Sequence, residues 1–544
     1  MASTSNSPFQ IRLPLILAAV LSVGMFIGQK LPRNESFIHY SPGSRKALNA
    51  AGSMDEVLRY IESKYVDTID TDALRDAAIE ELLAGLDPHS VYISPEELRA
   101  VQEDMSGNFE GIGVEFIVLD DTIQVVSPLS GGPSEAAGVM AGDKIVTIND
   151  TTVAGVKMET AQIYGRLRGP KGTQVRLGVR RGREPALREF VVTRDVIPVY
   201  SVDVAYMLNE QTGYIKVNRF TARTHQEFME ALTRLVEQEK MKDLVLDLRG
   251  NPGGYLNEAT DMLSQLFPEG KLLVYTEGRA EDRRNYKSNG RARFDIRNIA
   301  VLIDEGSASA SEIMAGAIQD HDRGWIVGRR SYGKGLVQEQ YPLSNGGALR
   351  LTVARYFTPS GRSIQRAYTG REEYEKDPQE RLKNGELSGK TAIPVSDSTA
   401  YYTGQGRIVF AHGGIMPDVF VPIDTSYMNA YYIKVRQQLP QFAARWLENQ
   451  PRSAFPEQLS TFRQNWQPAP QVIDELVAYA EQEGATPDPA QLAACRRELQ
   501  TQFKARIGKL LFQNDGLYSV LNDDDPAVEK AVRLLRDGAP LVKR

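Results

Sequence analysis

The feature that most constrains the fold is a repeated alternation of apolar strand-like segments and amphipathic helical segments between about residues 199 and 365. Leu244–Leu248 is typical of a buried strand, and Leu256–Phe267 after it has helical periodicity. The alternation continues through a strand at Lys271–Tyr275, a strand at Ile299–Ile303, a helix beginning near Ser309 and a strand at Trp325–Val327. This pattern predicts an α/β core with a mostly parallel sheet and helical cover.

The segments before and after this core have other periods. The chain has 544 residues, too many for one ordinary core, so we expect about three or four domains. Residues 54–102 have helical periodicity, broken by a turn at Leu86–Ser90 and restarted by an N-cap at Ser94. Between about 105 and 195 a period of two predicts a small β-barrel with two helices. Arg371–Lys390 is polar and charged, and we expect a loop or insertion there.

The N-terminus carries a targeting signal. An apolar run of 16 residues, Leu13–Gly28, follows Arg12 and precedes Lys30 and Arg33. The run is short for a membrane-spanning helix and slightly long for a signal-peptide core, and no Ala-x-Ala cleavage site follows it. We therefore interpret residues 1–30 as a signal anchor or signal peptide, and favour the uncleaved anchor. The body of the protein is then expected in the cell envelope, on the periplasmic side, tethered to the inner membrane.

Composition argues against several kinds of partner. The formal net charge of −6, with acids and bases well mixed, gives no reason to expect nucleic-acid binding. The single cysteine, Cys495, excludes an intramolecular disulfide and a thiolate metal cluster. The five histidines lack metal-ligand spacing, so we expect no metal site and no cofactor.

The clearest candidate for chemistry is the run Gly306–Glu312, where small residues and hydroxyls lie between a strand and a helix. Free backbone N–H groups and the dipole at the start of that helix would favour an oxyanion formed beside Ser309. The pattern Ser309-x-x-Glu312 is also a capping box, so the serine could serve only to cap the helix. Ser307 and Ser311 are rival hydroxyls.

A lysine bracketed by glycines, Lys334, follows about one strand later. To act as a base its amine must be neutral, and burial lowers a lysine pKa from a reference value of about 10.4. Leu336 and Val337 could form an apolar wall, and Gln338 is placed to orient the amine. The alternative is a solvated lysine in a glycine turn.

Two other interpretations of this region are weaker. Gly328–Lys334 has the spacing of a phosphate-binding loop, but Gly335 stands where magnesium binding requires Ser or Thr. A histidine base is also disfavoured, because His321 follows Ser309 by about three helical turns. Nucleotide binding and a histidine triad are therefore not expected.

Two glycine-rich segments could present backbone amides. Leu246–Gly254 ends a strand in a turn, which could form an oxyanion hole with the Ala310 amide or be only a tight connection. Gly111-Ile112-Gly113-Val114 could hold the terminal carboxylate of a peptide that adds as a strand, or be a simple hairpin.

Taken together, residues 54–425 resemble the carboxyl-terminal processing peptidases, or tail-specific proteases. The resemblance rests on motifs in one order along the chain: Leu86-Asp87-Pro88-His89-Ser90, Gly107-x-Phe109-x-Gly111-Ile112-Gly113, Asp247-Leu248-Arg249-x-Asn251-Pro252-Gly253-Gly254, Gly306–Glu312, Gly333-Lys334-Gly335-x-Val337-Gln338, Tyr356–Arg362 and Gly413-Gly414-Ile415-x-Pro417-Asp418. It implies a multidomain α/β plus β protein. The implied domains are an N-terminal signal (1–30), a tether and helical segment (31–104), an inserted PDZ-like barrel (105–195), a crotonase-like α/β serine-peptidase core (196–425) and a helical C-terminal extension (426–544).

The resemblance also implies residue roles. Ser309 would be the nucleophile, Lys334 the base and Gln338 its support. The oxyanion hole would use the Ala310 amide and that of Gly253 or Gly254, a choice that stays open. In the PDZ domain, Gly111, Ile112, Gly113 and Val114 would bind substrate C-termini, and Arg168 would couple this domain to the active site.

The function implied is a serine endopeptidase with a Ser–Lys dyad, which cleaves proteins after its PDZ domain recognises their C-termini. The alternative is a catalytically silent PDZ scaffold that binds the same termini. Expected partners are proteins or peptides with free C-termini, and the membrane through residues 1–30. A regulatory partner or a homo-oligomer is left open.

Overall fold

The computed structural model describes residues 51–538 except 130, 183, 185, 291–293, 369, 392–398 and 412. The apolar run Leu13–Gly28 lies outside these residues, so the anchor and the envelope location stay predictions. Among the described residues, no helix has the length and apolar character needed to cross a membrane. The chain divides into two compact units, Met1–Ala77 and Ala78–Arg544, and the limits of the five domains given above stay predictions.

Helices come first in the described chain, at α2 (Ala51–Lys64), α3 (Thr71–Ala84) and α4 (Pro95–Ser106). The predicted start of α4 is confirmed. Glu97 N–H donates to Ser94 Oγ at 3.3 Å, and Ser94 N–H donates to Glu97 Oε2 at 3.2 Å. The strand β1 (Val91–Ile93) was not predicted, because three residues between a turn and a helix give no period.

The barrel-like region is built on one antiparallel sheet. Its strand order is β3 (Val114–Leu119), β4 (Thr122–Pro128), β5 (Lys144–Ile148), β7 (Gln174–Arg180) and β8 (Arg188–Thr193), with β6 (Thr151–Thr152) on β5 and the helices α5 (Pro133–Ala136) and α6 (Thr160–Leu167). Ile123, Ile145 and Leu177 are fully buried in its core. The chain enters through β2 (Asn108–Gly111) and leaves through β9 (Asp195–Pro198), which pair with each other.

The predicted α/β core is confirmed. Its sheet has the order β10 (Val202–Met207), β11 (Thr212–Val217), β12 (Asp243–Asp247), β15 (Asn298–Ile303), β16 (Trp325–Gly328) and β21 (Val419–Phe420), and all neighbours are parallel except β10 and β11. One face packs on α7 (Thr224–Thr233), which continues as a π-helical turn (Arg234–Gln238), on α8 (Leu256–Ser264) and on α9 (Ala310–Asp320). Leu244 and Leu246 of β12 point into this cluster.

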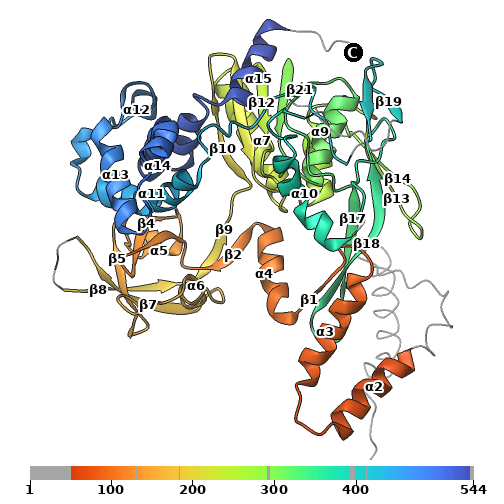
Figure 1. Ribbon diagram of the computed structural model, residues 1–544, viewed down its shortest axis with the longest axis horizontal. Coiled ribbons are helices and arrows are strands. Elements are labelled where there is room, and N and C mark those ends of the chain that lie inside the picture. The colour runs from red at the N-terminus through yellow and green to blue at the C-terminus, as the bar shows by residue number, and fades with distance from the viewer. Residues whose placement is uncertain are drawn as a thin grey trace, which may run out of the picture. The chain divides into compact units, whose positions relative to one another are not determined.

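The other face of the sheet is covered by the last helix of the chain. Val245 of β12 points to this face, where it joins Val528 and Leu535 of α15 (Pro526–Asp537) in a separate core cluster. In Figure 1 this helix is drawn in blue, and it contacts β12, β15 and β16. Alternate residues of one strand thus contact helices that lie far apart in the sequence.

A second sheet stands beside the first. Its order is β1, β18 (Ala348–Phe357), β13 (Leu272–Glu277) and β14 (Arg284–Lys287), and β17 (Leu336–Pro342) pairs with β18. The expected loop at Arg371–Lys390 is wrong in part, because α10 spans Arg371–Lys383. This helix has few apolar residues, and polar contacts fasten it instead: Arg366 pairs with Asp377 at 2.6 Å, and Arg381 pairs with Glu386 at 2.9 Å. The short strands β19 (Ala400–Tyr402) and β20 (Ile408–Phe410) follow.

Beyond the core, a helical region is present as predicted. It consists of α11 (Ala430–Glu448), a 3₁₀ turn (Arg452–Ala454), α12 (Leu459–Asn465), α13 (Pro470–Gln482) and α14 (Pro489–Leu521), and α14 is kinked at Phe512 and Gln513. It has its own core, in which Cys495 is buried. It also contacts β3 of the barrel, because Lys509 pairs with Glu115 at 2.9 Å.

Candidate active site

Ser309 lies at a sharp connection between β15 and α9. Its backbone has φ 53° and ψ −113°, a strained conformation for a residue with a side chain. The residue lines a pocket of about 550 Å³ that Lys334, Gln338, Gly254 and Tyr356 also line. The structure therefore brings the predicted nucleophile, base and supporting amide to one cavity.

The two rival serines lie elsewhere. Both are fully buried: the Ser307 hydroxyl donates to the carbonyl of Leu248 at 2.8 Å, and the Ser311 hydroxyl donates to the carbonyl of Asn251 at 3.0 Å. Neither lines the pocket. Of the three hydroxyls, only that of Ser309 lies where a substrate could reach it.

The Lys334 amine is oriented by a short chain of hydrogen bonds. Lys334 Nζ donates to Gln338 Oε1 at 3.1 Å, and Gln338 Nε2 donates to the carbonyl of His89 at 2.7 Å. Burial lowers the pKa of the Lys334 amine, and the positive charge of Arg350 lowers it further. The site thus favours the neutral amine that a base requires.

The carbonyl of His89 is held by the turn that the sequence marked as Leu86–Ser90. The Asp87 carboxylate accepts hydrogen bonds from the N–H of His89 at 2.9 Å and from the hydroxyls of Ser90 at 2.7 Å and Thr352 at 3.1 Å. From the sequence, the motif Leu86–Ser90 contributed to the family resemblance, but no role in the site was predicted for it. Its contact with Gln338 could not be predicted, because His89 and Gln338 are 249 residues apart in the chain.

Two buried residues, Glu312 and Tyr356, connect the serine segment with the lysine segment, and sequence reasoning missed this role for both. The Glu312 carboxylate accepts hydrogen bonds from the amides of Ser309 at 2.8 Å, Gly333 at 2.7 Å and Lys334 at 2.9 Å. The Tyr356 hydroxyl lies 2.7 Å from the carbonyl of Lys334 and 3.1 Å from that of Ser309. In the sequence, the capping box pointed to Glu312, and the motif Tyr356–Arg362 pointed to Tyr356.

The segment with the spacing of a phosphate-binding loop does not form one. The amides of Gly333 and Lys334, which would face a phosphate in such a loop, donate to the carboxylate of Glu312.

The structure of the loop that follows β12 shows a difference between the amides of Gly253 and Gly254, the two candidates for the oxyanion hole. Gly253 N–H donates to Asn251 Oδ1 at 2.8 Å, so it already has an acceptor. Within the described part of the chain, the amides of Gly254 and Ala310 have no hydrogen-bond acceptor, and Gly254 lines the pocket. Gly253 has φ 99° and packs tightly, since a Cβ on it would lie 2.6 Å from Ser309 Cβ. The free pair of amides is thus that of Ala310 and Gly254.

His321 is distant from this site. It follows the last residue of α9, at the opposite end from Ser309, and the helix is about 16 Å long at 1.5 Å per residue. Its Nε2 lies 2.6 Å from the carbonyl of Leu272.

The predicted peptide-binding residues connect β2 to β3. Gly111 ends β2, Val114 begins β3, and the carbonyl of Ile112 accepts a hydrogen bond from the Ser134 hydroxyl at 2.6 Å. Gly113 has φ 70°. Among the described strands, β3 pairs only with β4, so no described strand pairs with its second edge.

Arg168 contacts the helix that lies between the barrel and the pocket. Its guanidinium lies 3.6 Å from Glu103 of α4 and 4.6 Å from the ring centroid of Phe109. Val101 and Met105 of α4 line the pocket of Ser309. Arg168 itself does not line that pocket.

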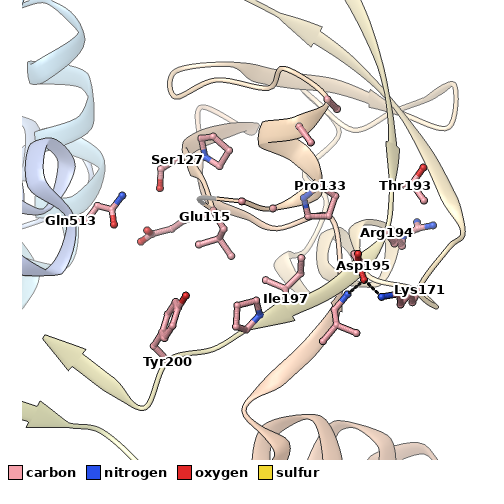
Figure 2. A pocket seen from close by; sticks show the side chains of 18 of the residues that line it. Glu115, Ser127, Pro133, Lys171, Thr193, Arg194, Asp195, Ile197, Tyr200 and Gln513 are labelled. Atoms are coloured by element: carbon pink, nitrogen blue, oxygen red, sulfur yellow. Dashed lines mark hydrogen bonds and ion pairs between the residues drawn. The ribbon is translucent and has the colours of Figure 1, made fainter. Parts of the chain in front are cut away.

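A larger hollow of about 790 Å³ lies elsewhere in the second unit, between the barrel, β9 and the kink of α14 (Figure 2). An ion pair of 2.6 Å between Lys171 and Asp195 lies on its wall, and Gln513 of the kinked helix faces it. None of the predicted catalytic or peptide-binding residues lines it.

Comparisons with known proteins match three segments of the chain. Residues 211–371 match the model of peptidase family S41, and residues 124–181 match that of the PDZ domain. Residues 431–513 match a family of unknown function, DUF8443.

Relatives that match more than half of the chain agree with the peptidase match. The chain is 38% identical to the carboxy-terminal-processing protease of Bartonella bacilliformis over 57% of this chain and 71% of that protein. It is 36% identical to the carboxyl-terminal-processing protease of Synechocystis sp. over 53% of this chain and 68% of that protein. Among solved structures, the photosystem II D1 C-terminal processing protease is 28% identical, with a TM-score of 0.36, over 68% of this chain and 87% of that one.

The identity and coverage of these relatives, together with the two family models, show that the chain belongs to the carboxy-terminal processing proteases, which are serine peptidases of family S41, and that it carries a PDZ domain.

Proposed function

We propose that the chain is an endopeptidase with a Ser309–Lys334 dyad that acts on proteins selected by their C-termini. The observation that carries this proposal is the shared pocket of Ser309, Lys334 and Gln338 beside the free amides of Ala310 and Gly254. The relatives are named carboxy-terminal-processing proteases, and these names support the proposal that substrates are selected by their C-termini.

In the proposed reaction, neutral Lys334 takes the proton of the Ser309 hydroxyl while the oxygen attacks a peptide carbonyl. The amides of Ala310 and Gly254 donate to the oxyanion that forms. Lys334 then gives its proton to the leaving amine, and an acyl-enzyme remains. Water, deprotonated by Lys334, hydrolyses the ester and restores Ser309.

Substrate selection is assigned to the PDZ domain. The amides of the Gly111–Val114 segment would hold the terminal carboxylate, and the substrate would extend as a strand along the second edge of β3. Arg168 contacts Glu103 of α4, and neighbouring residues of the same helix line the pocket, so α4 is the physical connection by which an occupied PDZ domain would act on the active site.

The test compares the full-length wild type with Ser309→Ala and Lys334→Ala on an unfolded protein with an apolar C-terminus. We expect each substitution to lower kcat/KM at least about 10³-fold, because nucleophile and base act as one unit. Lys434→Ala, which changes an exposed lysine of α11, should behave as wild type.

A second arm of this test uses tail peptides with free and amidated C-termini, and we expect only the free form to compete with cleavage. Cleavage that survives in Ser309→Ala would refute the dyad. Binding of free tails without any cleavage by wild type would instead support the silent scaffold.

A further inference from the structure

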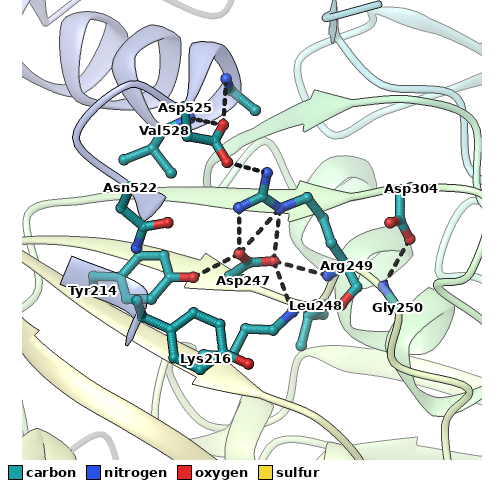
Figure 3. A network of polar contacts seen from close by, with 12 residues as sticks. Tyr214, Lys216, Asp247, Leu248, Arg249, Gly250, Asp304, Asn522, Asp525 and Val528 are labelled. Atoms are coloured by element: carbon teal, nitrogen blue, oxygen red, sulfur yellow. Dashed lines mark hydrogen bonds and ion pairs between the residues drawn. The ribbon is translucent and has the colours of Figure 1, made fainter. Parts of the chain in front are cut away.

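The sheet of the core contains a network of charged side chains around Asp247 and Arg249, where the chain leaves β12 (Figure 3). The Asp247 carboxylate is fully buried and accepts hydrogen bonds from the Tyr214 hydroxyl at 2.7 Å and from Arg249 Nη2 at 2.6 Å. Lys216 Nζ lies 3.3 Å from the same carboxylate. Although burial opposes it, the charges of Arg249 and Lys216 hold the pKa of Asp247 below its usual range, so this residue is an anion.

The guanidinium of Arg249 donates hydrogen bonds to two carboxylates. Nε and Nη2 donate to Asp247, whereas Nη1 donates to Asp525 Oδ2 at 2.6 Å. Asp525 is the N-cap of α15 and lies 276 residues further along the chain. The arginine therefore joins the strand β12 to α15, the last of the described helices.

The charges of this network balance only when Asp525 is included. Lys216 and Arg249 carry two positive charges, and Asp247 supplies one negative charge. The second negative charge comes from Asp525. Because an unpaired charge in a mostly buried site is costly, Arg249 cannot keep this position equally well without its second carboxylate.

The backbone of Arg249 lies at the start of the loop of Gly254 and is itself held by hydrogen bonds. Lys216 Nζ donates to the carbonyl of Arg249, and Gly250 N–H donates to Asp304 at 2.8 Å. Further along the loop, the carbonyl of Asn251 accepts from the N–H of Ala308, one residue before Ser309, at 2.9 Å. The five residues from Arg249 to Gly253 thus connect the charged network to the segment of the nucleophile, and Arg249, Gly250, Asn251 and Gly253 are each held by hydrogen bonds.

We propose that Asp525 is a positioning residue for catalysis, which fixes the oxyanion loop Gly250–Gly254 through Arg249. The inference rests on the proposed function, because it concerns the amide of Gly254 in that reaction. It also gives the C-terminal helix α15, to which the sequence assigned no chemistry, a contribution to the turnover of the enzyme.

The decisive variant is Asp525→Asn in the full chain. The Asp525 carboxylate also accepts from the amides of Ala527 at 2.8 Å and Val528 at 3.1 Å, and asparagine caps helices equally well. The substitution therefore keeps the acceptor of the helix start, and it replaces the carboxylate oxygen that faces Arg249 by a neutral NH₂ group that cannot accept from Arg249. We expect kcat per folded molecule to fall about tenfold or more with KM within about twofold, because a displaced oxyanion donor acts on the transition state.

Two further variants make the test specific. Asp525→Glu restores the carboxylate and should recover part of the lost kcat. Asp524→Asn removes the neighbouring carboxylate, which pairs only with the exposed Arg497 at 3.3 Å among the described residues, and should leave kcat unchanged. The folded fraction of each variant is measured by circular dichroism, so that a loss of folded protein is not counted as a loss of turnover.

The outcomes separate the inference from the function on which it rests. If wild type cleaves in a Ser309-dependent manner and Asp525→Asn has the wild-type kcat per folded molecule, the positioning role is refuted. A fall in Asp525→Asn that Asp525→Glu does not relieve at all would also refute it. If wild type does not cleave, the proposed function itself fails, and the inference fails with it.

Discussion

At the scale of single residues, the environment of Lys334 decides whether the proposed dyad can work near neutral pH. Burial and the charge of Arg350 both lower the pKa of its amine. The neighbouring His89 cannot replace it as the titrating group near neutrality, since burial and then the charge of Lys334 lower the pKa of His89 to about 4. His89 is thus not the group that a pH profile near neutrality would follow, and we expect that profile to follow Lys334.

This assignment gives a prediction for Arg350→Gln. Removal of the positive charge favours protonated Lys334 and raises its pKa. Since only the neutral amine is a base, the rise of kcat/KM with pH should move to higher pH. Activity at neutral pH should fall and return in alkaline buffer, as measured by pH–rate profiles.

Arg355→Gln is the control, because Arg355 lies on the same strand, β18, but does not line the pocket. A profile that stays in place in Arg350→Gln would contradict the role of Lys334 as the titrating base.

At the scale of elements, the site depends on how α9 and β17 are held together. Neither element alone positions the dyad, because Ser309 precedes α9 and Lys334 precedes β17. The buried carboxylate of Glu312 joins them through hydrogen bonds from both segments. Tyr356 of β18 contacts the carbonyls of the same two residues.

We predict that Glu312→Gln separates these elements. An amide can accept fewer of the N–H donors and brings its own NH₂ group against them, so the free energy of unfolding should fall by about 2–4 kcal/mol. Peptidase activity should be lost even where the protein remains folded. Chemical denaturation and a cleavage assay measure the two effects.

The matched control is Glu97→Gln, which changes the glutamate of the exposed capping box of α4. That change should cost less than about 1 kcal/mol. Equal effects of the two substitutions would show that Glu312 acts as an ordinary helix cap.

At the scale of the whole molecule, the contact between the PDZ domain and the peptidase core passes through α4. Arg168 contacts Glu103 and the ring of Phe109, and neighbouring residues of α4 line the catalytic pocket. A partly exposed ion pair and a cation–π contact are together worth on the order of 1 kcal/mol. This contact of Arg168 is thus weak enough for a bound tail to change it.

We predict that Arg168→Ala lowers kcat/KM for tail-bearing substrates about fivefold, the equivalent of this contact energy, while the Kd of a tail peptide stays unchanged. Fluorescence anisotropy with a labelled tail peptide and a cleavage assay separate the two quantities. Arg166→Ala changes an exposed arginine two residues earlier on α6 and should have little effect on either. A parallel loss of tail binding and cleavage in Arg168→Ala would instead place this residue in peptide binding.

The sequence by itself determined the features that depend on local periodicity and short motifs. The alternation of segments such as Leu244–Leu248 and Leu256–Phe267 predicted the α/β core, because a strand buried on both faces gives a short continuous apolar run and a helix buried on one face gives a helical period. The polar segment at Arg371–Lys390 misled the same reasoning, since α10 is stabilised by ion pairs that give no apolar period. Motifs likewise indicated Ser309 and Lys334, whose roles stay predictions.

Only the tertiary structure decided which segments meet. It distinguished Gly253 from Gly254, because the amide of Gly253 donates to the Asn251 side chain. It also placed the carbonyl of His89 within hydrogen-bond distance of Gln338. It also brought Asp525 to Arg249 across 276 residues. The physical reason is that such contacts are selected by shared burial and by the balance of charge between distant segments, and neither leaves a trace in the order of neighbouring residues.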